Sequence, residues 1–426
     1  MIGIIFLALA VLLIIGVPVS LAIGVSCLIQ LLVNGSIPLT IIPQRIYIGM
    51  DSFTLMAIPF FMMAGDLMNR GGVTKRLIDF CEVLVGRIKG GMALVNILDS
   101  MLFAGLNGAA VADVAALGPL EIQMMTGSGY PRNYAAAVTA ASSIIGPIIP
   151  PSIVMVVYGV TANVSVGGLF AGAIIPGTLT GLMMMGLIYY QAHKHSFPYR
   201  KEPLPFNIIV KRIISAIPAL TIPLVIVGGM LSGVFTATEA GAVAVLCSII
   251  ISVFIYKELK LKDILPICKQ VLINSGIVVL IIAMANVFVW LLTTYQVPMM
   301  VQEFVTSFIK SPYVFLLFTN IFLLLVGCVI ESAAAIILFV PVLVPLTVSY
   351  GIDPLHFGLI FVLNLIVGMV TPPVGTVLYV TCSVAKVKFE ELSRALVPFL
   401  IILFAMLLII TYVPAFSLTL PKLLGY

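Results

Sequence analysis

The chain has 426 residues, of which 62% are hydrophobic and only 9% are charged, and its formal net charge is +5. This composition excludes a soluble globular protein and predicts an all-α polytopic membrane protein. The basic residues lie mainly between apolar segments, a pattern that reflects membrane topology rather than nucleic-acid binding. We therefore expect the chain to contact membrane lipid and no nucleic acid.

The first apolar run, residues 3–32, is longer than the roughly 20 residues that cross a bilayer. It has no basic segment before it, so we expect a retained membrane segment rather than a cleaved signal peptide. Gly16 and Pro18 predict a kink or a break within the run. A further apolar segment follows at 55–68, and the charged residues of 74–89 predict an amphipathic helix at the membrane surface.

One pattern then occurs twice in the chain, with the two copies 222 positions apart. Each copy has an apolar segment interrupted by small residues, about 91–125 and about 312–348, followed by an apolar segment that contains Pro-Pro, about 133–163 and about 355–383. The matching glycines and prolines are Gly105 and Gly327, Pro119 and Pro341, Gly129 and Gly351, Gly146 and Gly368, Pro150 and Pro372, and Pro151 and Pro373. Interrupted segments in corresponding halves point to the midplane binding site of a secondary transporter.

The interrupted segments are too long for one crossing, and they predict two re-entrant helical hairpins, whereas the Pro-Pro segments predict two broken transmembrane helices. We expect a first repeat over 1–192, a basic cytoplasmic linker over 193–212 and a second repeat over 213–426. If an odd number of crossings separates the copies, they form inverted repeats, the architecture of alternating access. Further spans are expected near 166–191, 213–232, 236–256, 271–294 and 395–415.

The two Pro-Pro pairs each remove two consecutive amide donors and so free backbone carbonyl groups. In hydrocarbon an unpaired carbonyl costs several kcal/mol, and a bound cation is one way to satisfy it. The alternative is a static kink repaired by neighbouring hydroxyls or water. Ser152 and Thr371 add side-chain oxygens beside the carbonyls of the breaks. Crowded neutral oxygens suit Na⁺, and no His, Cys or carboxylate cluster indicates a transition metal.

The centres of the two interrupted segments supply the facing side chains, Asn107 in the first and Glu331 and Ser332 in the second. An acid inside a membrane is a functional candidate by default, although Glu331 can also be protonated or bonded to a backbone amide. The other acids near segment ends are expected to snorkel or to cap helices. These acids are Asp66, Asp99, Asp113, Glu121 and Glu239.

The centres of the apolar segments contain essentially no Lys or Arg. A carboxylate substrate would therefore meet half-helix N-termini and hydroxyl groups, or Arg132 near a segment end. The candidate substrate contacts are Asn107, Ser152, Ser332 and Thr376.

Common enzyme motifs are missing from the sequence. It contains no GxxxxGKS/T loop, no HExxH and no GxSxG, and its six cysteines and three histidines form no metal-binding pattern. We therefore expect no enzyme, and an intramembrane enzyme is the alternative from a different class.

Five stretches together resemble the large membrane subunit of tripartite ATP-independent periplasmic (TRAP) transporters. They are AIPFFMMAGDLMNRGGVTKRL, AVADVAALG, GPIIPPS, ESAAAIILFVPVLVPL and GMVTPPVG. The resemblance implies a sodium-driven importer of an organic acid in the bacterial inner membrane, with a scaffold and an elevator-type transport domain. It also implies two partners, a small four-helix membrane subunit and a periplasmic substrate-binding protein. No small subunit is fused to this sequence, so that partner is expected to be a separate chain.

The resemblance further implies two Na⁺ sites with the substrate between them. The family's first site uses a Ser-x-Ser hairpin tip, where this chain has Asn107 and Ala109. One side-chain oxygen is changed there and one is lost, while the backbone positions are kept. The residues carried over to the first site are Asn107, Gly146, Ile148 and Pro151. Those carried over to the second site are Gly327, Glu331, Ser332, Val370, Thr371 and Pro372.

The leading hypothesis is a sodium-coupled importer of a sugar acid such as sialic acid, or of a dicarboxylate. A standalone divalent-anion/sodium symporter or ion antiporter with two related hairpins is the alternative, and it would need no binding protein.

Overall fold

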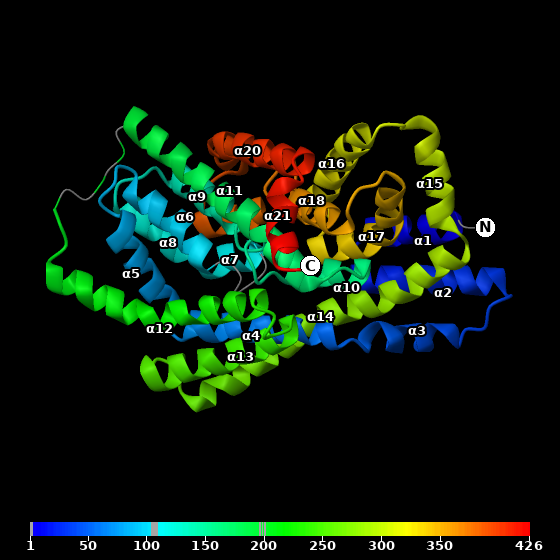
Figure 1. The fold of residues 1–426 in the computed structure, drawn as a ribbon, viewed down its shortest axis with the longest axis horizontal. Helices are drawn as coiled ribbons and strands as arrows, with labels where there is room; N and C mark the ends of the chain where they lie inside the picture. Colours follow the sequence, from blue (N-terminus) through cyan, green and yellow to red (C-terminus); the bar gives the residue numbers. More distant parts are fainter. Residues whose placement is uncertain (1–2, 104–109, 196, 198, 200–201) are drawn as a thin grey trace.

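The computed structural model describes residues 3–103, 110–195, 197, 199 and 202–426, and these residues form helices and no strand (Figure 1). The expected all-α class is confirmed. The helices are α1 (Gly3–Ile14), α2 (Val19–Asn34), α3 (Ile41–Met50), η1 (Phe53–Met56), α4 (Ala57–Arg70), α5 (Val73–Val85), α6 (Gly91–Phe103), α7 (Ala110–Ala116), α8 (Gly118–Gly127), α9 (Arg132–Ser143), α10 (Ile153–Ala162), α11 (Val166–Lys194), α12 (Phe206–Leu231), α13 (Ala237–Ile249), η2 (Ile250–Ile255), α14 (Leu261–Thr294), α15 (Val297–Phe308), α16 (Pro312–Val329), α17 (Ser332–Ser349), α18 (Pro354–Gly368), α19 (Thr376–Ala385), α20 (Phe389–Tyr412) and α21 (Ala415–Leu423).

Seven of the described helices are long and apolar enough to cross a membrane. An eighth span is obtained if Ile41–Met50 and Phe53–Arg70, which meet at a 59° bend, are counted together. The protein is therefore a multi-pass membrane protein, as the composition predicts.

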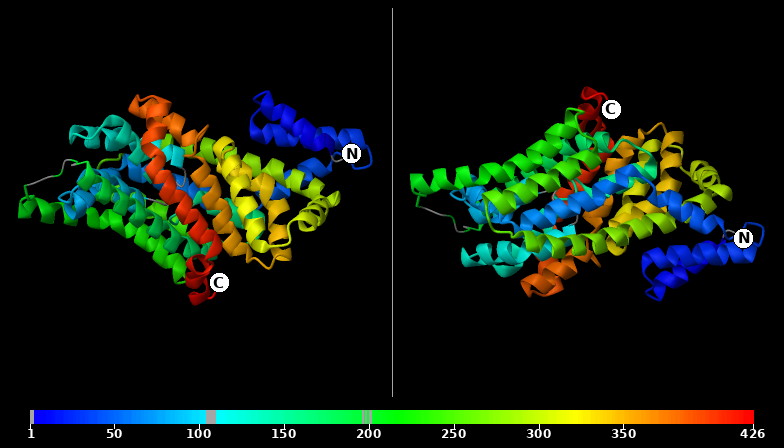
Figure 2. Two further views of the ribbon diagram at one scale, coloured as in Figure 1. Left: turned by 90° about the horizontal axis from the view of Figure 1, so that it is seen from above. Right: turned by 90° about the horizontal axis from the view of Figure 1, so that it is seen from below.

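The N-terminal apolar run is broken rather than kinked. α1 ends at Ile14 and α2 begins at Val19, with Gly16 at a φ of 87° and Pro18 directly before α2. Glycine adopts this left-handed conformation without steric cost, and proline is compatible with a helix start. The two short helices pack against each other and lie together at one end of the molecule (Figure 2).

Two groups of helices make up the rest of the molecule. A long-helix layer contains α2, α3, α4, α12, α13 and α14, and Figure 1 shows it along one side of a central bundle that contains α6 to α11 and α16 to α20. The layer meets the bundle where α4 contacts α10 and where α14 contacts α17. The hairpins and broken helices therefore lie in the central bundle, and the long-helix layer flanks them.

Within the bundle, each broken helix packs against the hairpin of the other copy. α10 contacts α17, and α19 contacts α7. The first half of each broken helix also contacts the span that follows the broken helix of the other copy. α9 contacts α20, and α18 contacts α11. This reciprocal packing fits a pair of related repeats, and their inverted orientation stays a prediction.

The amphipathic helix α5 is held between α12 and α6. Its buried face includes Val73, Leu77 and Cys81. Arg212 of α12 forms ion pairs with Asp79 at 3.1 Å and with Glu82 at 2.5 Å. α5 is therefore anchored to the long-helix layer at one side and to the first hairpin at the other.

Several helices extend further than their apolar windows predict. α12 begins at Phe206, inside the expected linker, α14 begins at Leu261 and α20 begins at Phe389. The polar residues at these ends lower local hydropathy without interrupting the helix. The sequence analysis also missed α3, α15 and α21, because each is too short or too polar to be recognised as a span.

Two glycines allow α16 and α18 to approach closely. A Cβ added at Gly327 would lie 2.6 Å from the Leu365 carbonyl oxygen, and a Cβ added at Gly368 would lie 2.7 Å from the carbonyl carbon of Gly327. Both contacts are with backbone, which cannot move aside as a flexible side chain can. The arm of the second hairpin is therefore packed directly on the second broken helix.

We expect Gly368→Ala to destabilise the protein by about 1–3 kcal/mol, because the added methyl group overpacks this contact. Thermal unfolding in detergent measures the effect. Gly276→Ala in α14 is the matched control, since nothing lies within 4 Å of a Cβ at that position. Equal midpoints for the two variants would show that the close approach does not matter for stability.

Candidate functional site

The second hairpin and the second break lie side by side. The Gly375 amide donates to the Cys328 carbonyl at 3.2 Å, and the Ser332 hydroxyl contacts the Met369 sulfur at 3.3 Å. α16 and α17 reach this point through the residues where one helix ends and the next begins. The structure therefore brings Gly327, Glu331 and Ser332 next to the break that contains Val370, Thr371 and Pro372.

The backbone of the second break is only partly satisfied. Pro372 cannot donate to Gly368 in the usual helical pattern, and the Thr371 amide donates to that carbonyl instead, at 2.9 Å. The Met369 carbonyl accepts from the Val377 amide at 3.1 Å. Among the described residues, no hydrogen bond reaches the carbonyls of Val370 or Pro372.

The polar side chains around this break differ in their hydrogen bonds and in their burial. The Thr371 hydroxyl donates to the Val367 carbonyl at 2.7 Å, which leaves its oxygen lone pairs free to face a cation. Glu331 is exposed and caps α17 by accepting from the Ala334 amide at 3.2 Å. Ser332 is buried. An accessible carboxylate, a threonine oxygen and two free carbonyls therefore gather at one place.

At the first break a side chain replaces one of the lost backbone donors. Pro151 cannot donate to the Pro147 carbonyl, and the Ser152 hydroxyl donates to it at 2.6 Å. Ser152 is fully buried and also accepts from the Met155 amide at 3.4 Å, which caps α10. In the part of the chain with assigned positions, the carbonyls of Gly146 and Ile148 receive no hydrogen bond.

Two further residues were predicted to contact the substrate, Asn107 and Thr376. Asn107, like Gly105 and Ala109, lies outside the described residues. Thr376 begins α19, and its buried hydroxyl oxygen has no hydrogen-bond partner among the described residues. Both Pro-Pro peptide bonds are cis.

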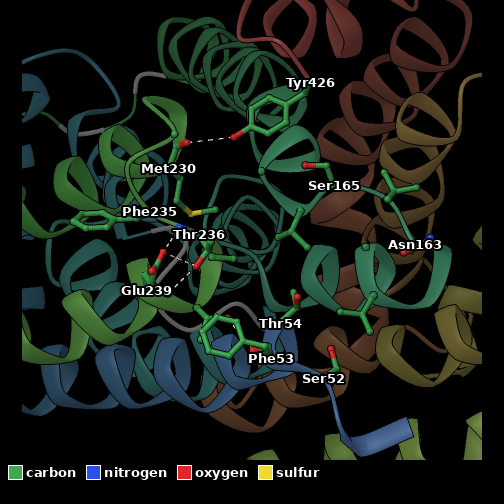
Figure 3. Close-up of a pocket in the computed structure, with 18 of the residues that line it drawn as sticks. Ser52, Phe53, Thr54, Asn163, Ser165, Met230, Phe235, Thr236, Glu239 and Tyr426 are labelled. Atoms are coloured by element: carbon green, nitrogen blue, oxygen red, sulfur yellow. Dashed lines mark hydrogen bonds between the residues drawn. The ribbon is translucent and has the colours of Figure 1, made fainter. Parts of the chain in front are cut away.

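A separate cavity of about 600 Å³ lies between the long-helix layer and the bundle (Figure 3). Three of its polar side chains already serve as helix caps, because Ser165 caps α11 and Thr236 and Glu239 form a capping box on α13. None of the predicted site residues lines this cavity. The expectation that Glu239 caps a helix is confirmed.

The structure excludes snorkelling for two other acids. Asp99 is 0% exposed and Glu121 is 3% exposed, so neither snorkels to the membrane surface. Asp99 shares a face of α6 with Asn96 and Phe103, and that face is turned into the bundle. The spacing of three and four residues was the signal in the sequence that indicated this buried face.

A polar network surrounds these acids. The Asn96 amide nitrogen donates to Glu121 at 3.1 Å and to the Thr139 hydroxyl at 2.8 Å, and the Ser142 hydroxyl donates to the Asn96 oxygen at 2.7 Å. Across the described residues, no group of three His, Cys, Asp or Glu side chains is arranged to hold a metal ion. The network therefore differs in chemistry from the carbonyl-rich breaks.

Known proteins match the whole chain. Residues 6–416 match the family described as "Tripartite ATP-independent periplasmic transporter, DctM component". The chain is 39% identical over 415 residues to the sialic acid TRAP transporter large permease protein SiaM of Vibrio cholerae serotype O1, covering 96% of each chain. It is 42% identical over 382 residues to the C4-dicarboxylate TRAP transporter large permease protein DctM of Pseudomonas aeruginosa, covering 88% of each.

Among solved structures, the chain resembles the Alcanivorax borkumensis YdaH transporter, with a TM-score of 0.63 and 13% sequence identity over 88% of this chain and 87% of that one. This likeness concerns the fold alone. The relatives in sequence are transport permeases rather than enzymes. The chain belongs to the family of tripartite ATP-independent periplasmic transporters, as a DctM component, the large permease of the inner membrane.

Proposed function

We propose that this permease imports a small organic acid across the bacterial inner membrane in a sodium-coupled reaction. The observation that supports it is the group of oxygens at the second break. The free carbonyls of Val370 and Pro372, the Thr371 oxygen and the exposed Glu331 meet there, and none of the ion pairs of the described residues involves Glu331. Uncompensated oxygen donors in a membrane favour a bound cation, and neutral oxygens favour Na⁺ over a transition metal.

In this proposal the second Na⁺ is held by Val370, Thr371 and Pro372 with Glu331 or Ser332. Gly327 contributes by its size, because a side chain there would push the hairpin away from the break. The first Na⁺ is held by the carbonyls of the first break. Its ligands are Gly146, Ile148 and Pro151, together with Asn107.

The organic acid is proposed to bind between the two ions, with Asn107, Ser152, Ser332 and Thr376 as contacts. Helices α10, α17 and α19 begin at or directly after Ser152, Ser332 and Thr376, and helix N-termini attract carboxylates through their amides and their dipole. Relatives named for sialic acid and for C4-dicarboxylates match this chain to a similar degree. We favour a sugar acid such as sialic acid, with a dicarboxylate as the second choice.

For the transport step we propose an elevator mechanism. The hairpins and broken helices contact one another extensively across the two copies, so they are suited to move as one body. The long-helix layer would remain in place as the scaffold. α5, anchored by Arg212 on one side and packed on α6 on the other, would connect the two parts.

The family name describes a three-part system, and we propose the same assembly here. A small four-helix membrane subunit would be a separate chain, and a periplasmic binding protein would deliver the substrate. The competing proposal is a standalone symporter or antiporter, which the likeness to the YdaH transporter fold keeps in consideration.

Proteoliposomes that contain the permease test this proposal. We expect uptake of the organic acid only when the small subunit, the loaded binding protein and an inward sodium gradient are all present. Equally fast uptake without the sodium gradient would contradict sodium coupling. Uptake of free substrate by the permease alone would favour the standalone alternative.

Thr371→Val should weaken sodium dependence more than Ser152→Ala does. Thr371→Val removes one cation ligand, and we expect the half-saturating sodium concentration to rise about tenfold, the effect of ~1.4 kcal/mol. Ser152→Ala should instead lower the thermal midpoint, because the buried Pro147 carbonyl loses its donor. Sodium titrations of uptake and thermal unfolding distinguish the two effects, and identical sodium titrations would reject this ranking.

Glu331→Gln and Glu331→Ala separate the two roles of this side chain. The glutamine oxygen can still accept from the Ala334 amide, so stability should be retained, whereas the alanine variant should lose about 1 kcal/mol of helix capping. Both variants should raise the half-saturating sodium concentration if the carboxylate contributes to the cation site. A normal sodium titration for Glu331→Gln would restrict Glu331 to capping.

A further inference from the structure

Two buried asparagines join the second hairpin to the second broken helix. The side-chain nitrogen of Asn364 on α18 donates to the side-chain oxygen of Asn320 on α16 at 2.7 Å. Asn320 is 2% exposed and Asn364 is 0% exposed. A buried amide that loses its partner destabilises a protein far more than an exposed one does, so this bond constrains how the two helices pack. We call these two residues the asparagine pair.

The asparagine pair lies in a mainly apolar contact between helices. The buried residues of α16 include Leu316, Asn320, Leu323 and Gly327, at spacings of four, three and four residues. This spacing forms one continuous seam along a helix, and α16 packs against α18 (Figure 1). An asparagine at a seam position fixes the register of two packed helices, because other alignments bury its amide against apolar side chains.

Both helices run in the same direction from the asparagine pair toward the second break. Gly327 lies seven residues further along α16, and Gly368 lies four residues further along α18. These two glycines meet, because a Cβ added at Gly368 would lie 2.7 Å from the carbonyl carbon of Gly327. The glycines permit the close approach but form no directional bond between their side chains. The asparagine pair supplies that bond further up the same seam.

The register of the seam decides where the end of the hairpin lies beside the break. In the observed register the Ser332 hydroxyl contacts the Met369 sulfur at 3.3 Å. A slip by one helical turn would move the end of the hairpin by about 5.4 Å along α18. The Asn364 amide would then face Leu316 or Leu323, whose side chains cannot accept a hydrogen bond. The observed alignment is therefore the one that satisfies the asparagine pair.

The first copy joins its hairpin to its broken helix in a corresponding way. The Ser142 hydroxyl of α9 donates to the side-chain oxygen of Asn96 on α6 at 2.7 Å, and both residues are buried. Ser142 lies four residues before Gly146, as Asn364 lies four residues before Gly368. In both copies, an asparagine of the hairpin arm thus accepts from the same position of the broken helix. A hydroxyl and an amide make the same link, which indicates that the link itself is needed.

The other hydrogen bond of Asn320 leads to a different helix. Its side-chain nitrogen donates to the Thr411 hydroxyl of α20 at 3.0 Å, and Thr411 donates to the Leu407 carbonyl at 2.7 Å. This bond connects α16 to α20, whereas the bond to Asn364 aligns α16 with α18. The two bonds of one side chain can therefore be removed separately.

We propose that Asn320 and Asn364 are positioning residues, which set the register of the second hairpin on α18 and so hold the end of the hairpin beside the open carbonyls of the break. They act through the two helices and are not ligands themselves. The inference rests on the sodium site proposed above. It adds that the alignment of the site is built into the helix contact, so the hairpin and the break stay matched while they move.

Disulfide formation in the full-length permease, kept in membranes, measures the register directly. Ser332→Cys and Met369→Cys are introduced after the six native cysteines are replaced by alanine, and mild oxidation then joins the end of the hairpin to the break. Asn320→Leu/Asn364→Leu replaces the asparagine pair by two apolar side chains and leaves no amide unpaired. We expect this leucine variant to keep its thermal midpoint and to form the disulfide severalfold more slowly.

Sodium-dependent uptake by the leucine variant, with its native cysteines, measures the consequence for the site. The half-saturating sodium concentration should rise about tenfold, the effect of ~1.4 kcal/mol, because the hairpin no longer holds its oxygens at the break. Thr411→Val is the matched control, since it removes the other bond of Asn320, and it should keep the disulfide rate and the sodium titration of the wild type. A role in stability alone would not change both readouts at an unchanged midpoint.

Asn364→Ser and Asn364→Ala provide a second comparison, and they differ by one hydroxyl group. The serine can donate to Asn320 as Ser142 donates to Asn96, so it should retain the wild-type disulfide rate. The alanine cannot donate and should form the disulfide more slowly. This comparison decides the question if the leucine variant does not fold.

A folded leucine variant with a wild-type disulfide rate, or with a wild-type sodium titration, overturns the proposal. If that variant does not fold, equal disulfide rates for the serine and alanine variants overturn it. A slower disulfide together with wild-type uptake that does not depend on sodium would leave the positioning of the hairpin in place and would count against the proposed sodium coupling instead.

Discussion

The architecture depends on a backbone constraint. A membrane interior offers no water to hydrogen-bond a carbonyl, so each proline pair creates oxygens that the protein or a ligand must satisfy. Both breaks are surrounded by protein on several sides, because each broken helix packs against the hairpin of the opposite copy. This packing permits irregular backbone at membrane depth, and at the second break the hairpin residues lie directly beside it.

The two breaks differ in how their freed carbonyl groups are hydrogen-bonded. At the first, the buried Ser152 supplies a donor to the Pro147 carbonyl, while among the described residues the carbonyls of Gly146 and Ile148 receive no hydrogen bond. At the second, the freed oxygens of Val370 and Pro372 stay open next to an exposed carboxylate. Both breaks thus keep open carbonyls among the described residues, and they differ in that a serine hydroxyl replaces a lost backbone donor only at the first.

The helical class and the positions of the breaks could be predicted because they follow from composition and from proline, whose effect is local. The proximity of Ser332 to Met369 could only be suggested by the repeat, since it depends on how distant helices pack. Asp99 and Glu121 were misjudged for the same reason. Their positions along the chain resemble segment ends, and only the packing of α6 against α8 and α9 shows that they are buried.

Charge balance links the breaks to the transport of an anion. An organic anion that crosses a bilayer within a moving body carries charge through a low-dielectric region, and the cost falls when cations travel with it. Carbonyl oxygens at the breaks can hold sodium without adding charge of their own.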